Sequence, residues 1–230
     1  MTRFLTRRFL PAGSRRAVMS GAALVFAAWL ATLVGSNGYA APAAAAASPA
    51  VDAARFAIVP TASTVTYRVG ETFFTGNQVG TAVGTTHAIQ GDIFVDRAHP
   101  ASSRIGTITI DISTFQSDRA RRDRAIREEW LESSRFPTAT FTPTAIQGLP
   151  LTYTEGQAIP VHIAGNLRVR DVTKPVTFTG MVRLAGDTLT GSFQTMVLMT
   201  DFGFEPPSIV GMLKAENQVR LDLQLTAQRV

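Results

Sequence analysis

Apolar and polar residues alternate along most of the chain from Arg55 to the C-terminus. Such alternation is typical of antiparallel strands that have one buried and one wet face. Clusters of Pro, Gly and Asp separate the runs and indicate turns. We therefore predict an all-β domain of about eight antiparallel strands. The clearest alternating runs cover residues 64–69, 89–96, 107–112, 138–146, 161–169, 176–184 and 219–226.

A sheet of this size must protect its edge strands. Closing into a barrel removes the edges, and packing two sheets face to face covers them nearly as well. The pattern favours a barrel only slightly. The interior of an eight-stranded barrel is just wide enough to be filled by side chains or to hold one small ligand. Periodicity does not decide between a filled and a hollow interior.

One charged stretch, about residues 117–135, predicts a short helical insertion between strands. Ser117 is a suitable N-cap, Ile126 and Trp130 share one helical face, and Pro137 ends the segment. Six arginines and five acidic residues crowd this stretch. A nucleic-acid surface needs a net positive potential, so this balance argues against a nucleic-acid partner.

The net charge of +5 comes from the N-terminus. Five of the 22 basic residues precede Ala17, the first acidic residue is Asp52, and from Ala41 onward 17 basic residues face 17 acidic ones. The basic start, the uncharged run Ala17–Gly35 and the small residues near Ala40 predict an export signal over residues 1–40. An Ala/Pro-rich linker over 41–54 then leads to a domain over 55–230. This predicts a periplasmic or secreted protein, exported by the twin-arginine or the general route, with an uncleaved membrane anchor as the alternative.

Residues that carry catalytic chemistry are sparse. The chain has no cysteine, which rules out disulfides, a thiol nucleophile and thiolate metal ligands. His87, His99 and His162 are scattered without metal-ligand spacing, and no nucleotide-binding or nucleophile-elbow motif occurs. We predict neither an enzyme nor a cofactor.

Three motifs resemble the signature of the YceI-like family. The first is RRDRAIREEWLESSRFPTATF, with an Arg122-Asp123 pair before a helix and a Phe136-Pro137 step into a strand; the second is GNLRVRDVTKPVTF from Gly165; the third is DFGF followed by ENQVRLDLQL. The resemblance implies a lipocalin-like antiparallel barrel with a helical insertion, located in the periplasm, that holds a long isoprenoid or similar lipid. Many members carry a histidine near the first hairpin, whereas this chain has none there, so no role is transferred to that position.

The proposed ligand is a polyisoprenoid, quinone or fatty-acid-like chain inside the barrel. Arg122 and Asp123 are expected to fix the helix against the barrel, and Phe136 and Pro137 to end it, with Ile126 and Trp130 closing one side of the pocket. Two alternatives stay open: a filled barrel that partners an envelope or membrane redox protein, and an enzyme acting on a membrane-derived lipid. Transient membrane contact and dimer formation also stay open. The residues expected to line the pocket are Trp130, Phe141, Phe178, Val182, Leu189, Phe193, Val197 and Leu223.

Overall fold

A computed structural model describes residues 53–209 and 212–230. These residues belong to one compact unit. The predicted export signal, its cleavage near Ala40 and nearly all of the predicted linker lie outside the described residues.

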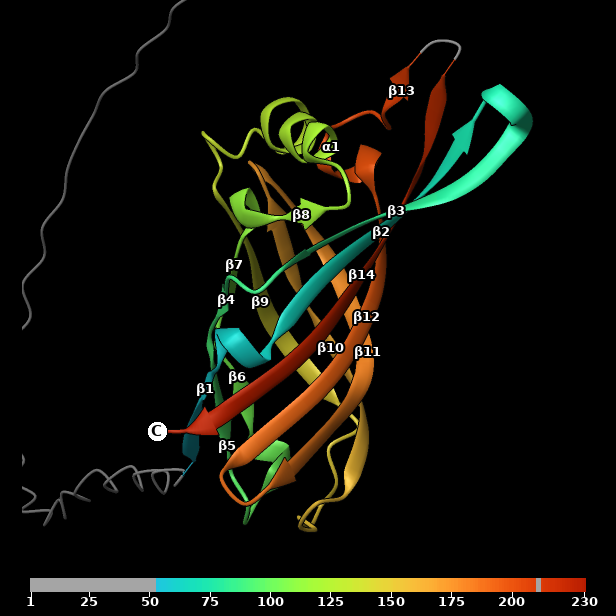
Figure 1. Cartoon of the computed structure of the whole chain (residues 1–230). Coiled ribbons are helices and arrows are strands. Elements are labelled where there is room, and N and C mark those ends of the chain that lie inside the picture. Colours follow the sequence, from blue (N-terminus) through green and yellow to red (C-terminus); the bar gives the residue numbers. More distant parts are fainter. Residues whose placement is uncertain (1–52, 210–211) are drawn as a thin grey trace, which may run out of the picture. The chain divides into compact units, whose positions relative to one another are not determined.

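Antiparallel strands make up most of the described chain (Figure 1). The strands are β1 Ala54–Ile58, β2 Thr64–Phe73, β3 Gln78–Thr86, β4 Ile89–Gln90, β5 Asp92–Val95, β6 Arg104–Ile105, β7 Ile108–Asp111, β8 Gln116–Ser117, β9 Thr138–Gln147, β10 Ala158–Val169, β11 Val172–Ala185, β12 Thr188–Leu198, β13 Ser208–Ile209 and β14 Leu213–Arg229. The helices are η1 Pro60–Ala62, η2 Thr75–Asn77, η3 Pro100–Ser102, η4 Ile112–Thr114, α1 Ala120–Ala125, η5 Ile126–Trp130 and η6 Met199–Phe202. No helix in this described part is long and apolar enough to cross a membrane.

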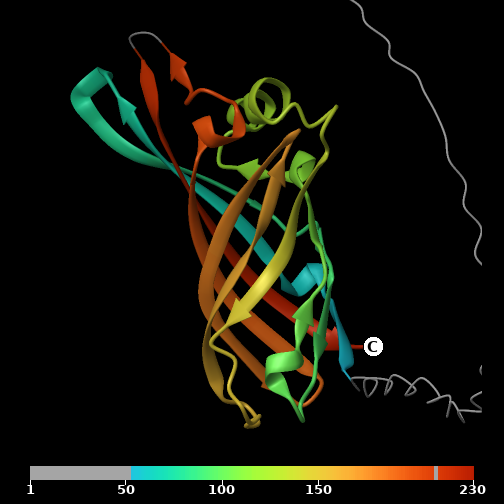
Figure 2. The ribbon, with the colours of Figure 1, turned by 180° about the vertical axis from the view of Figure 1, so that it is seen from behind.

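The strands close into a barrel. Its wall has eight strand paths, where a path is one strand or several consecutive short strands that continue along the same line. β1 and β2 form the first path, β3 to β5 the second and β6 to β8 the third. The other five paths are β9, β10, β11, β12 and β14, and each path is antiparallel to the next. The last path then pairs with the first, as in Leu223↔Val65 and Ala227↔Ile58. Figures 1 and 2 show this wall from opposite sides. The fold is therefore the predicted all-β antiparallel barrel, because a continuous ring of pairing leaves no pair of separate sheets.

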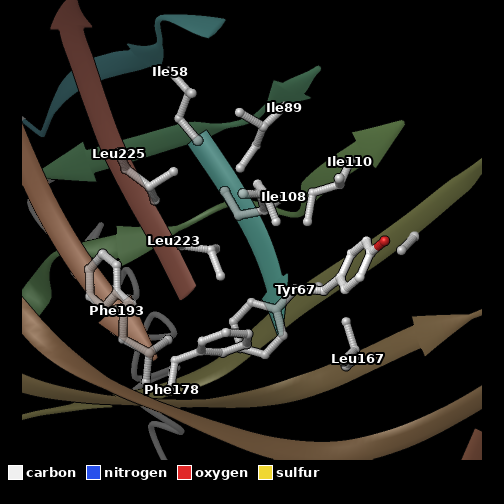
Figure 3. Packing of buried hydrophobic residues seen from close by; sticks show 14 of the residues in the cluster. Ile58, Tyr67, Ile89, Ile108, Ile110, Leu167, Phe178, Phe193, Leu223 and Leu225 are labelled. Carbon is white, nitrogen blue, oxygen red and sulfur yellow. The ribbon is translucent and has the colours of Figure 1, made fainter. Parts of the chain in front are cut away.

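The alternation predicted from sequence sets which side chains face inward. On β10, Val161, Ile163 and Leu167 are buried, whereas His162 and Asn166 are exposed. Figure 3 shows buried side chains from strands all around the barrel meeting in its interior. The apolar face of the sheet is the inner wall.

Buried hydroxyl groups form hydrogen bonds with backbone groups at two breaks in the wall, between β1 and β2 and between β3 and β4. Ser63, 1% exposed, donates from Oγ to the carbonyl of Val59 at 2.8 Å and accepts from the N–H of Thr226 at 3.0 Å. Thr86 Oγ1 accepts from the N–H of Ala88 at 3.0 Å and lies 2.6 Å from Thr114 Oγ1. These bonds let the paths bend without leaving buried polar groups unpaired.

The helical insertion is shorter than the predicted 117–135. Ser117 is not an N-cap; it lies in β8, opposite Gly84, and its N–H and Oγ donate to Asp123 Oδ1 at 2.9 and 2.6 Å. α1 therefore begins at Ala120. Glu132, with a φ of +45°, ends the helical run after Trp130, because the left-handed conformation cannot continue a right-handed helix.

Candidate ligand-binding cavity

A cavity of about 840 Å³ occupies the half of the barrel next to α1 and η5, the upper half in Figure 1. We call it the upper cavity. Its wall consists mainly of inward apolar side chains, and three of the inward positions are alanines, which leave room. Among the lining residues are Val65, Val69, Ala82, Ile110, Phe115, Ala139, Leu167, Ala215 and Leu221.

A second cavity, of about 120 Å³, lies in the other half of the barrel. We call it the lower cavity. Aromatic and large aliphatic side chains fill most of this half, and the loop after β9 contributes Leu149 and Tyr153. The same eight strands thus surround a hollow half and a nearly filled half.

Four residues line both cavities and form a floor between them: Ile108, Phe141, Phe178 and Leu223. The rings of Phe141 and Phe178 meet edge to face, with centroids 5.0 Å apart and planes at 73°. This arrangement is favoured by the aromatic quadrupole. Figure 3 shows Phe178 and Leu223 pointing into the middle of the barrel.

Gly165 of β10 makes room for this floor. β10 lies between β9, which carries Phe141, and β11, which carries Phe178. A Cβ atom on Gly165 would come within 2.6 Å of the Phe141 ring, closer than carbon atoms can approach. The first residue of the GNLRVRDVTKPVTF motif is therefore glycine because a ring lies against its backbone.

The structure divides the eight predicted lining residues between the two cavities. Trp130 and Val197 line the upper cavity, and Val182, Leu189 and Phe193 line the lower one. The remaining three, Phe141, Phe178 and Leu223, belong to the floor.

Sequence reasoning missed several residues of the upper cavity. Tyr67, Phe115 and Phe202 are buried and line it, together with the three alanines. Tyr67 and Phe115 pack edge to face with centroids 5.2 Å apart. The inward positions of β2 were visible in the alternation. The aromatic pair was not, because Phe115 reaches Tyr67 from a distant turn.

Charged side chains gather where the helical insertion covers the upper cavity. Arg122 Nη2 lies 3.0 Å from Glu71 Oε2 of β2, and the two side chains are 15% and 8% exposed. Arg122 also pairs with Asp118. Arg119, Arg121 and Arg122 line the cavity, with Glu71 as the one acidic lining residue in the described chain. Arg119 also pairs with Asp118, and the Arg122–Glu71 ion pair ties α1 to the barrel wall.

Phe136 and Pro137 lie after the helical run. Phe136 is half-buried, and the guanidinium groups of Arg135 and Arg170 lie over its ring at 4.8 and 5.9 Å. The carbonyl of Pro137 accepts from the N–H of Ile112 at 2.9 Å, one residue before β9 begins. Neither residue lines the upper cavity. They lead the chain from the helical insertion back into the sheet.

Tyr67 is the titratable group most affected by the cavity wall. Burial, reinforced by the negative charge of Asp123, raises the pKa of Tyr67 to about 12. The hydroxyl therefore stays protonated at neutral pH, and the wall around it stays uncharged.

None of the three histidines lines either cavity. His87 Nδ1 lies 2.6 Å from the carbonyl oxygen of Ser63, His99 is an exposed neighbour of Asp96, and His162 is on the outer face of β10. Within residues 53–209 and 212–230, no three His, Cys, Asp or Glu side chains gather as a metal site. The mainly apolar lining of the upper cavity suits an apolar ligand.

Comparison with known proteins gives concordant results. The model of the YceI-like domain matches residues 56–227. Protein YceI of Salmonella arizonae is 32% identical over 105 residues, which cover 45% of this chain and 50% of that protein. The chain thus spans about half the length of the curated relatives it matches.

Two solved structures share the fold. Burkholderia cenocepacia BcnA is 18% identical with a TM-score of 0.56, over 74% of this chain and 99% of that one. A polyisoprenoid binding domain from Saccharophagus degradans, implicated in plant cell wall breakdown, is 15% identical with a TM-score of 0.58, over 76% of this chain and 98% of that one.

Proposed function

The chain belongs to the YceI-like family, and from this membership and the upper cavity we propose that it holds a long apolar lipid inside the barrel. The ligand is a polyisoprenoid, a quinone or a fatty-acid-like chain. The observation that carries the proposal is the apolar void of about 840 Å³. Ligand cavities in proteins measure roughly 300–1,000 Å³. A barrel acting only as a filled scaffold needs no such void. The polyisoprenoid binding domain of similar fold supports the same assignment.

Hydrophobic transfer supplies the binding free energy. Burial of each CH2 group contributes about 0.8 kcal/mol. An apolar wall offers few directional contacts, so affinity follows chain length and tolerates changes in chain type. Arg119 and Arg121 line the cavity and are exposed to solvent, so a polar end of the ligand would lie beside them and near water.

The protein acts by binding, and it is exported to the periplasm or secreted. Support for the first point is the wall chemistry: the lining offers no nucleophile paired with a base. Support for the second is the sequence pattern of residues 1–40.

Native mass spectrometry of gently purified full-length protein, followed by lipid extraction, tests the proposal. We expect a bound apolar lipid, or uptake of an added prenyl alcohol or quinone. Ala139→Phe places a ring in the upper cavity and should weaken uptake. Thr140→Phe places the same ring on the other face of β9 and should not. A barrel that binds neither class of lipid, or an Ala139→Phe variant that binds normally, contradicts the proposal.

A further inference from the structure

Two hairpin tips beside the opening of the upper cavity expose apolar side chains. Phe74 and Val79 at the β2–β3 tip are 52% and 78% exposed, and Ile209 and Met212 at the β13–β14 tip are 47% and 61% exposed. The N–H of Phe74 donates to the carbonyl of Met212 at 3.0 Å, so the two tips are neighbours. Figures 1 and 2 both show the tips at the end of the barrel that carries α1.

Unpaired charges of the described chain lie at the same end, the acidic Glu128 and Glu129 on η5 and two arginines on α1. Arg121 and Arg124 of α1 are exposed, and in the described chain no carboxylate lies within 4.0 Å of either side chain. Arg121 also lines the upper cavity. Exposed apolar tips beside free guanidinium groups match the boundary between acyl chains and anionic head groups in a bilayer.

We propose that these six residues, Phe74, Val79, Ile209, Met212, Arg121 and Arg124, dock the protein on an anionic phospholipid bilayer. We call them the docking surface. The apolar tips enter the head-group boundary, and the arginines contact lipid phosphates. Exposed apolar groups gathered beside polar ones mark an interaction site.

The position of the cavity selects a bilayer as the partner. Ile209 and Met212 belong to the docking surface and also line the upper cavity. A bilayer that receives these tips therefore meets the opening of the cavity directly. An apolar ligand can then pass between membrane and barrel without crossing water.

Site-specific labelling of the full chain tests the docking surface. Because the chain has no cysteine, Phe74→Cys or Met212→Cys gives a unique site for an environment-sensitive dye. Leu151→Cys is the matched control, since Leu151 is 89% exposed in the loop after β9, beside residues of the lower cavity. We expect a blue shift at positions 74 and 212, but not at 151, on adding phosphatidylcholine vesicles that contain phosphatidylglycerol. The site-specific readout separates docking from any attachment through residues 1–52.

Charge variants test the role of the arginines. In the Phe74→Cys background, Arg121→Gln and Arg124→Gln should each raise the vesicle concentration needed for half the shift by roughly fivefold. Arg183→Gln removes an exposed arginine of β11 near Gly156, and should leave that concentration unchanged. Added salt should weaken binding of the parent protein more than that of the double variant.

Three outcomes overturn the proposal. One is an equal shift, or none, at positions 74 and 151. Another is a shift at position 74 that grows with protein concentration without vesicles, which identifies a contact between two copies of the chain. The third is unchanged vesicle binding in the double arginine variant. The vesicle titration does not require a filled cavity, so its failure leaves the proposed lipid binding standing, and lipid binding can fail while docking succeeds.

Discussion

The upper and lower halves of the barrel are built from the same strands but differ in how they are filled. The upper half encloses about 840 Å³ and has four alanines among its lining residues, whereas the lower half encloses about 120 Å³ and has no alanine in its lining. Both halves show the same alternation of apolar and polar residues. A hollow interior therefore depends on side-chain volume at each inward position.

Glycines explain how the lower half is filled. Phe193 packs over Gly180 of β11 and Gly191 of its own strand, where a Cβ atom would come within 2.6 and 2.4 Å of the ring. Rings that lie against bare backbone fill the barrel without pushing the strands apart. The upper half has two such contacts: the Tyr67 ring lies against Gly84, and the Phe73 ring lies 3.1 Å from the position of a Cβ atom on Gly80.

Removing the floor between the cavities should have the largest effect on the free energy of unfolding. Phe178→Ala deletes a buried ring that separates the cavities, and we expect a loss of about 3–5 kcal/mol in the free energy of unfolding. The variant should also accept longer prenyl alcohols, because the two cavities join. Urea unfolding and native mass spectrometry measure the two effects.

Phe178→Leu is the matched control for the floor, since it keeps most of the apolar volume and should lose less than about 1.5 kcal/mol. A loss below about 1 kcal/mol in Phe178→Ala, with unchanged ligand length, would show that Phe178 does not separate the halves.

Breaking the ion pair beneath the helical insertion should have the next largest effect. Arg122→Ala leaves the Glu71 carboxylate, 8% exposed, without its partner, and we expect a loss of roughly 2–3 kcal/mol. Adding Glu71→Gln should restore part of this loss, because it removes the uncompensated charge. Urea unfolding of both variants measures these changes. Arg183→Ala, at an exposed site, is the control, and its free energy of unfolding should stay within about 0.5 kcal/mol of the parent. An additive double variant would contradict a direct pairing.

A matched pair of alanine substitutions compares the halves directly. Ala227→Leu adds volume at a 0% exposed position that borders neither cavity, and should cost about 1–3 kcal/mol. Ala82→Leu adds the same volume facing the upper cavity and should cost less than about 1 kcal/mol. Thermal and urea unfolding distinguish the two, and equal costs would mean that the upper half is filled.

The sequence predicted the strands through local alternation, which favoured a barrel over two packed sheets only slightly; the resemblance to the YceI-like family implied the barrel. The sequence placed the helical insertion correctly but began it at Ser117, because the bond from Ser117 to Asp123 and its pairing with Gly84 depend on tertiary contacts.

The division of the cavity could not be predicted from the sequence. Phe141 and Phe178 come from β9 and β11, and they meet only because Gly165 of the intervening β10 carries no side chain. The alternation placed both rings inside the barrel but gave no measure of the volume left beside them. It therefore grouped residues of both halves into one pocket.

The smallest expected effect concerns Tyr67, an aromatic residue that lies against a glycine in the upper half. An unfolded chain ionises this tyrosine near its usual pKa of 10.0, whereas the folded protein holds the proton until about 12. The resulting stabilisation of the folded state is fully present below pH 10 and is lost as the pH rises through 12. The total loss is roughly 2–3 kcal/mol. Tyr67→Phe should therefore match the parent at neutral pH and lose less stability than the parent under alkaline conditions.

Asp123→Asn sharpens this test, because it removes the nearby charge and keeps an oxygen that accepts from Ser117. Tyrosinate absorbance should then show Tyr67 titrating closer to 10 than in the parent, while urea unfolding across the alkaline range reports the stability of both variants. Burial is the larger cause of the raised pKa, so the shift should shrink without disappearing. A parent protein whose Tyr67 titrates at 10 would show that water reaches this wall freely, and the hollow half would then be an open groove.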